Sequence, residues 1–141
     1  MIDQFSGEYR FLSNFYAAIV TINDWQFPTA EHAYQAAKST DPVVWRQFQH
    51  GKDFLTAGQA KRLGSRITMR PDWNDIKLDV MDEIVHVKFE QNSDLMLRLI
   101  MTNPVELVEG NRWGDTFWGV CNGVGTNYLG KILMTIRQEN I

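Results

Sequence analysis

The longest periodic apolar pattern constrains the fold most, and it follows the sequence Arg70-Pro71-Asp72-Trp73. Apolar side chains recur there at helical spacing, at Ile76, Val80, Met81, Ile84, Val85 and Val87. A stripe with a period near 3.6 residues predicts an amphipathic helix that buries one face. We expect this helix to end between residues 88 and 92.

Shorter elements are expected before this helix. β-Branched and aromatic residues at 18–27 flank the turn signal Asn23-Asp24, a pattern typical of a short hairpin. Asp41-Pro42 predicts a helix that begins with an acidic cap and a proline in its first turn. Residues 56–64, which run from a threonine to a glycine, predict a further short helix.

Further elements are expected after the long helix. Ser93 is a candidate N-cap for a helix that Asn103-Pro104 would stop. We expect a short strand at 105–109, then a loop at 110–125 that is rich in Gly, Asn and aromatic residues, then a final helix opened by Asn127. The apolar side chains expected inside that helix are Leu129, Ile132, Leu133 and Ile136.

Composition restricts the class of protein. The chain has 141 residues, of which 44% are hydrophobic and 22% charged, as is typical of one globular domain. Its net charge of −3 argues against a non-specific nucleic-acid binder, which would usually be basic. The charge is still compatible with an enzyme that contacts a nucleic acid at one nucleotide.

Cysteine use and hydropathy indicate the compartment. The single cysteine, Cys121, excludes an internal disulfide, and with three scattered histidines it argues against a structural zinc site. The N-terminus lacks a signal-peptide pattern, and no apolar run approaches the roughly 20 residues that cross a bilayer. We therefore expect a cytoplasmic protein that is not associated with a membrane and needs no metal.

A polar stripe marks the helix predicted at residues 28–38. Thr29 is a plausible N-cap, and Glu31, Gln35 and Lys38 follow at positions i, i+4 and i+7 of one helical face. Small alanines around the stripe would let the helix pack closely while an acid, an amide and an ammonium converge on one spot. The alternative is an ordinary solvated face, on which Glu31 complements the helix dipole.

Two loops could offer polar groups to a ligand. Ser13-Asn14 lies between bulky aromatic residues, which suits either a rigid ligand-binding loop or a simple turn capped by Asn14. The second loop carries Glu109, Asp115, Trp118, Gly119, Gly125 and Asn127. Gly-rich turns before a helix can hold phosphate, but the same glycines are equally expected where segments pack tightly.

These segments together resemble one family, the NADAR or YbiA-like proteins. The pieces that match, in the family's order, are Phe11 to Phe15; Glu31, Gln35 and Lys38; Arg70, Asp72 and Trp73; Lys88, Phe89, Gln91 and Asn92; Thr102 and Leu107 to Glu109; Asp115, Trp118 and Gly119; and Gly125, Asn127, Leu129, Gly130, Met134 and Arg137. The resemblance implies an α+β, mostly helical single domain over residues 1–141, with a small β-sheet.

The resemblance also implies a function, namely N-glycosidase chemistry on ribose joined to a nitrogen base or amine, without a cofactor. Members are associated with ribosylamino-pyrimidine phosphates of the riboflavin pathway, or with ADP-ribose attached to guanine in nucleic acid. Val120 stands where some members carry an acid, so we expect ADP-ribosylated guanine in DNA to be the substrate. The protein would then oppose a DNA ADP-ribosyltransferase. The competing class is a module that binds ADP-ribose without cleaving it.

Roles follow for the candidate residues. Breaking a ribose–nitrogen bond builds positive charge on the ribose, which a carboxylate can stabilise. Glu31 is the expected catalytic carboxylate, because the resemblance and its place on the polar stripe both point to it. Asp115 and Glu109 are second choices that would hold ribose hydroxyls, and Lys38 would contact a phosphate or orient Glu31. The remaining expected substrate contacts are Ser13, Asn14, Trp73, Trp118, Gly119, Gly125 and Asn127. A basic pocket mouth would be formed by Lys38, Arg70, Lys88 or Arg112.

Overall fold

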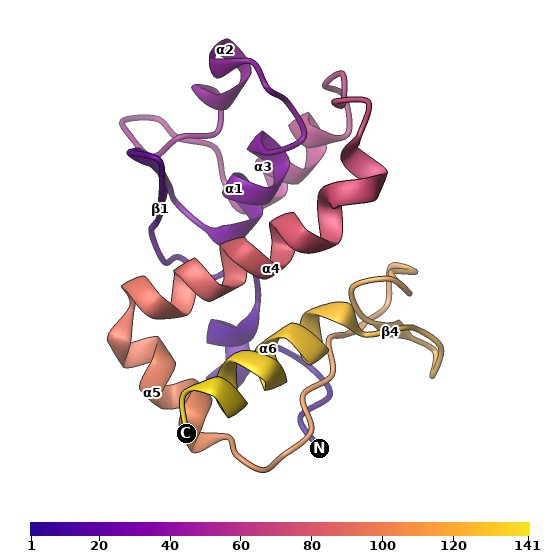
Figure 1. Ribbon diagram of the computed structural model, residues 1–141. Coiled ribbons are helices and arrows are strands. Elements are labelled where there is room, and N and C mark those ends of the chain that lie inside the picture. Colours follow the sequence, from indigo (N-terminus) through magenta and orange to yellow (C-terminus); the bar gives the residue numbers. More distant parts are fainter. The chain divides into compact units, whose positions relative to one another are not determined.

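The structure is a computed structural model that describes residues 1–141, and it consists of two compact units (Figure 1). Unit 1 comprises Met1–Ser13 and Asn92–Ile141, and unit 2 comprises Asn14–Gln91. Helices dominate both units and the strands are two or three residues long. The α+β, mostly helical class is therefore confirmed. No helix has the length and apolar character needed to span a membrane.

Unit 2 begins with the predicted hairpin. Strands β1 (Val20–Ile22) and β2 (Trp25–Phe27) pair antiparallel, with Val20 opposite Phe27. The two turn residues, Asn23 and Asp24, have φ values of 50° and 68°. Positive φ at both central positions is the geometry that matches the twist of a two-residue hairpin, and Asn and Asp tolerate it best.

Helix α1 (Ala30–Ala36) follows β2 and is buried along its whole length. Thr29 caps it as predicted, since its hydroxyl accepts a hydrogen bond from the backbone N–H of His32 at 3.2 Å. The helix packs against β2, α3 and α4 of its unit. It ends earlier than the polar stripe suggested, because Ala37 is its C-cap and Lys38 lies in the turn that follows.

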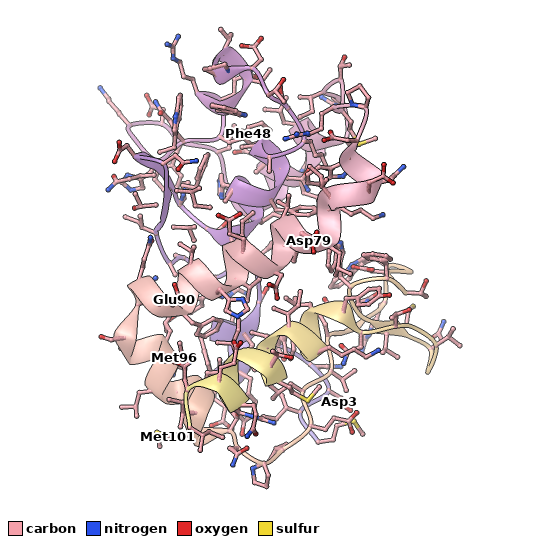
Figure 2. All side chains as sticks on the ribbon, in the orientation of Figure 1. Asp3, Phe48, Asp79, Glu90, Met96 and Met101 are labelled. Atoms are coloured by element: carbon pink, nitrogen blue, oxygen red, sulfur yellow. The ribbon has the colours of Figure 1, made fainter.

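Helices α2 (Pro42–Trp45) and α3 (Ala57–Gly64) begin at local capping signals, as predicted. The Asp41 carboxylate accepts a hydrogen bond from Val43 N at 2.9 Å. Thr56 and Gln59 form a reciprocal capping box. Phe48, labelled in Figure 2, is fully buried and anchors the segment after α2.

Helix α4 (Trp73–Gln91) confirms the long predicted helix, but its buried face differs from the expected stripe. The buried residues are Trp73, Met81, Ile84, Val85, Lys88 and Phe89, whereas Ile76, Val80 and Val87 are only half-buried. Lys88 follows Met81 at i+7 and Ile84 at i+4, so helical geometry takes it inside with them. Asp79 and Glu90, labelled in Figure 2, lie on the exposed side.

Unit 1 contains the 3-10 helix η1 (Gly7–Leu12) and helices α5 (Ser93–Met101) and α6 (Tyr128–Glu139). Helices α5 and α6 pack against each other (Figure 1). The four apolar residues predicted inside the last helix are all buried. The predicted cap of α5 is wrong by one residue: the N-cap position is Asn92, which makes no side-chain capping bond.

The strand expected at residues 105–109 is also wrong. Leu107 forms only an isolated parallel bridge with Ile2, supported by hydrogen bonds from Ile2 N to Glu106 O and from Val108 N to Ile2 O, each 2.8 Å. The neighbouring ladder instead joins β3 (Gly110–Asn111) to β4 (Val120–Cys121) in parallel, inside the segment predicted to be a loop. The β-structure is thus two separate two-stranded pairs.

Candidate active site

Glu31 lies in the first turn of α1 and is 8% exposed. Gln35, one turn later, donates a hydrogen bond from Nε2 to Glu31 Oε1 at 2.7 Å. The backbone N–H of Glu31 donates to the carbonyl of Asn14 at 3.1 Å. The stripe predicted from spacing is therefore a buried contact rather than a solvated face, and it holds the carboxylate in one orientation.

Lys38 completes this cluster from the turn after α1. Burial lowers its pKa, while its attraction to Glu31 acts in the opposite direction. Its ammonium nitrogen Nζ lies 3.4 Å from the carbonyl oxygen of Gly64, the last residue of α3. Lys38 thus lies close enough to Glu31 for the two charges to interact, although it lies outside the helix that carries Glu31.

Two buried oxygen atoms beside Glu31 lack a hydrogen-bond partner. They are Asn14 Oδ1 and Gln35 Oε1. Asn14 directs its side-chain amide nitrogen to Met81 Sδ at 3.4 Å, which is a weak acceptor. Unsatisfied buried acceptors are costly and often mark catalytic sites or places that a bound water completes. Both belong to residues that contact Glu31, which supports Asn14 as part of the site.

Trp73 does not offer a ring face to a ligand. It is 4% exposed and packs against Tyr34, with ring centroids 5.1 Å apart. The expected stacking role is therefore corrected to a core role, because a wall for a base or ribose needs an uncovered face.

The prediction that Lys88 contributes to a basic pocket mouth is also wrong. Its side chain is 0% exposed, and burial lowers its pKa to about 7. Arg70 is held by a two-point contact with Asp72, at 2.6 and 3.0 Å. Arg112 is exposed and belongs to the other unit.

A second group of predicted residues lies in unit 1, where Asn111 organises the loop. Its side-chain nitrogen donates to Glu109 Oε2 at 3.1 Å and to the carbonyl of Asp115 at 2.8 Å, and its oxygen accepts from Asp115 N at 3.0 Å. Asp115 Oδ1 in turn accepts from the N–H groups of Phe117 and Trp118, at 3.1 and 2.9 Å. Glu109 and Asp115 are thus brought together, and Asp115 shapes the turn.

Asn127 stabilises this loop instead of capping α6. It adopts a left-handed backbone with φ of 58° and makes no side-chain capping bond. Its amide bridges two backbone groups, accepting from Glu109 N at 2.9 Å and donating to Leu107 O at 3.0 Å. Both amide atoms are engaged with the protein, so a substrate contact would have to compete with them.

The loop glycines fit the tight-packing alternative. A side chain at Gly119 would overlap the backbone and carboxylate of Glu109, and one at Gly125 would overlap the carbonyl of Gly119. Gly125 also has a φ of 155°. Packing alone therefore explains both glycines.

Trp118 and Ser13 are half-buried. The Trp118 ring packs edge-on against Phe117, with centroids 4.7 Å apart, and lies 6.4 Å from Tyr128. Ser13 caps the end of η1, with its N–H donating to Arg10 O at 2.9 Å. It belongs to unit 1, while Asn14 belongs to unit 2.

Sequence reasoning missed two residues that organise these clusters, Gly64 and Asn111. The sequence marked Gly64 only as the end of a helix and gave no signal for Asn111, because each acts through residues of another element or turn. It also missed a cavity of about 610 Å³ in unit 1, lined by Met1, Asp3, Arg98 and Met101 among others. None of the predicted site residues lines that cavity.

Comparison with known proteins identifies the family. The model of the NADAR domain matches residues 3–139. The chain is 40% identical to the riboflavin biosynthesis protein VVA0006 of Vibrio vulnificus over 92% of its own length, although it spans only 35% of that protein. It is 33% identical to the N-glycosidase YbiA of Escherichia coli, with 95% of this chain and 83% of YbiA covered.

An N-glycosidase of Nostoc punctiforme is 36% identical, with 93% of this chain and 85% of that protein covered. The NMR structure of the E. coli protein YbiA matches with a TM-score of 0.83 and 31% identity, over 99% of this chain and 86% of that one. The family match runs through both units, and the site residues come from segments that lie within it. The chain belongs to the NADAR domain family.

Proposed function

We propose that this chain is an N-glycosidase, a hydrolase that cleaves the bond between ribose C1 and a nitrogen atom. The observation that carries the proposal is the buried carboxylate of Glu31, held at 2.7 Å by the amide of Gln35. Similarity to proteins named N-glycosidase, at 33 and 36% identity over most of both chains, supports the same class of reaction.

The chemistry follows from the charge that develops during cleavage. As the C1–N bond breaks, the ribose ring becomes positively charged and the base leaves with the electron pair. A carboxylate can stabilise that ring or take a proton from the attacking water, whose oxygen then bonds to C1. The departing nitrogen gains the proton that the water has lost, so that the base leaves in its neutral form. A carboxylate fixed in a largely buried position does this better than one in water, because its orientation is set before the reaction.

Lys38 adds a cation beside this carboxylate. Its attraction to Glu31 favours the charged form of the amine, against the effect of burial. The charge would assist a substrate that carries phosphate, or would help to orient Glu31. Asn14, with its unsatisfied side-chain oxygen, would accept a hydrogen bond from a hydroxyl of the ribose or from the attacking water.

For the substrate we propose ADP-ribose joined to guanine in DNA, with a DNA ADP-ribosyltransferase as the opposing activity. The support is the family resemblance together with Val120, a half-buried residue of β4, at a position where some members carry an acid. The products would be free ADP-ribose and unmodified guanine.

A second candidate substrate is a ribosylamino-pyrimidine phosphate. The observation that favours it is the 40% identity to a protein named for riboflavin biosynthesis. It would be cleaved at the same type of bond by the same carboxylate.

One experiment separates these possibilities. The protein is incubated with ADP-ribosylated guanine in single-stranded DNA and, in parallel, with a ribosylamino-pyrimidine phosphate, and products are identified by mass spectrometry. Release of ADP-ribose over many turnovers supports the first substrate, and fast release of ribose phosphate with untouched DNA supports the second. A stoichiometric complex without released product would instead indicate a binding module, and the variant Glu31→Gln is the matched control.

A further inference from the structure

Gly64, the last residue of α3, is buried, and a side chain added there would meet the side chain of Gln35. A Cβ atom placed there would overlap the side-chain oxygen of Gln35, and would lie 2.5 Å from Gln35 Cδ and 3.0 Å from Gln35 Cβ. Gly58, on the same helix, has no atom within 4 Å of the corresponding point. Gly64 has no left-handed backbone that would require glycine. Alanine forms helices better, so the contact with Gln35 is a structural reason for a glycine at 64.

The Gln35 amide lies between Glu31 and Gly64. Its Nε2 donates to Glu31 Oε1 at 2.7 Å, and its Oε1 is buried without a hydrogen-bond partner. The opposite orientation would point the amide oxygen at a carboxylate oxygen, which repels it. The oxygen therefore lies against Gly64, at the point that a Cβ atom of this residue would occupy.

Gly64 also contacts the third member of the stripe. Its carbonyl oxygen lies 3.4 Å from Lys38 Nζ. Carbonyl groups at a helix C-terminus attract cations, so the end of α3 is a suitable place for this ammonium. One residue of α3 thus touches both side chains that flank Glu31.

We propose that Gly64 is a positioning residue for the reaction at Glu31, and that it acts through Gln35. The space left by its missing side chain admits the amide that orients the carboxylate. This inference rests on the proposed N-glycosidase function. A methyl group at this position would displace the amide and release Glu31 from its hydrogen bond.

The test compares Gly64→Ala with Gly58→Ala, which makes the same chemical change on the same helix. We expect Gly58→Ala to keep wild-type kcat, and Gly64→Ala to lose about tenfold to a hundredfold in kcat with a smaller change in KM, as misplaced catalytic groups do. In a protein that already carries Gln35→Ala, the further change Gly64→Ala should lower kcat less than about twofold. The effects of two residues that act as one unit do not add.

A second readout does not depend on activity. The side-chain NH2 signals of Gln35 in a ¹⁵N–¹H spectrum should shift in Gly64→Ala and stay in place in Gly58→Ala. If neither substrate is turned over by the wild type, the proposed function is wrong, and this spectrum still decides whether Gly64 positions Gln35.

Three outcomes would overturn the proposal. The first is wild-type kcat and unshifted Gln35 signals in Gly64→Ala. The second is a Gly64→Ala cost that is equally large with and without Gln35. If Gly64→Ala does not fold, the Gln35→Ala variant is measured instead. The third outcome that would overturn the proposal is a folded Gln35→Ala variant with wild-type kcat.

Discussion

Lys88 provides a quantitative test of the interior of unit 2. Its side chain is 0% exposed on α4, and burial lowers its pKa from 10.5 to about 7. The amine lies 5.9 Å from the centroid of the Tyr16 ring and 5.1 Å from that of Phe89. The variant Lys88→Met keeps the side chain long and unbranched while it removes the titrating group.

The lowered pKa makes the free energy of unfolding depend on pH. The folded protein releases the Lys88 proton near pH 7, whereas the unfolded chain keeps it until about pH 10.5. Between these values the unfolded state binds more protons, so the stability contributed by this group rises with pH. At about 1.4 kcal/mol per pKa unit, wild type should gain roughly 3 kcal/mol relative to Lys88→Met between about pH 7 and about pH 9.5.

The assay is urea unfolding of both proteins at a series of pH values in matched buffers. The other titrating groups are common to both proteins, so they largely cancel in the difference between the two free energies. A difference that stays constant across this pH range would refute the reasoning, because the Lys88 amine would then have the same pKa in both states. The reasoning would also be wrong if the stability of wild type relative to Lys88→Met fell as the pH rose.

Three further predictions concern the site and the substrate. Glu31→Gln should reduce turnover at least about a hundredfold, as loss of an acid–base group does. Its circular dichroism and melting temperature should stay close to wild type, because the new amide oxygen can still accept a hydrogen bond from Gln35. Wild-type turnover in this variant would remove Glu31 from the mechanism. Trp118→Ala should weaken ligand binding by about 1–3 kcal/mol, whereas Trp73→Ala should cost about 3–5 kcal/mol of stability. Calorimetric titration measures the first effect and thermal melts the second. The prediction is wrong if Trp118→Ala mainly lowers the melting temperature and Trp73→Ala mainly weakens binding. Cleavage of an ADP-ribosylated oligonucleotide should slow with added salt, with a shallow slope because few phosphates are contacted, and an equal salt effect on free ADP-ribosyl-guanosine would argue against contact with the polynucleotide.

Local signals in the sequence were sufficient for much of the fold. The Asn23-Asp24 turn, the caps at Thr29 and Asp41 and the helix that begins near Thr56 were all predicted correctly. Each depends on a backbone conformation and a hydrogen bond within four residues, so the chain needs no distant partner to form it. The family resemblance likewise needed only the order of short motifs.

Part of the candidate site could be predicted for the same reason. Glu31 and Gln35 are one helical turn apart, and the spacing alone places their side chains together. The sequence did not show whether water or protein surrounds that pair. This depends on α3 and α4, which bury α1 from other parts of the chain.

The remaining features were decided by tertiary structure alone. Lys88 is inside because the helix that carries it turns Met81 and Ile84 toward the same core, although its charge favours the surface. Leu107 forms only a bridge with Ile2 where a strand was expected, and Asn127 uses its amide to bind Leu107 and Glu109 instead of capping its helix. The sequence by itself determined the hairpin, the caps and the Glu31–Gln35 pair, because those interactions are local. Tertiary structure decided which polar groups are buried and what holds them, because those partners are distant in the chain and meet only when the elements pack.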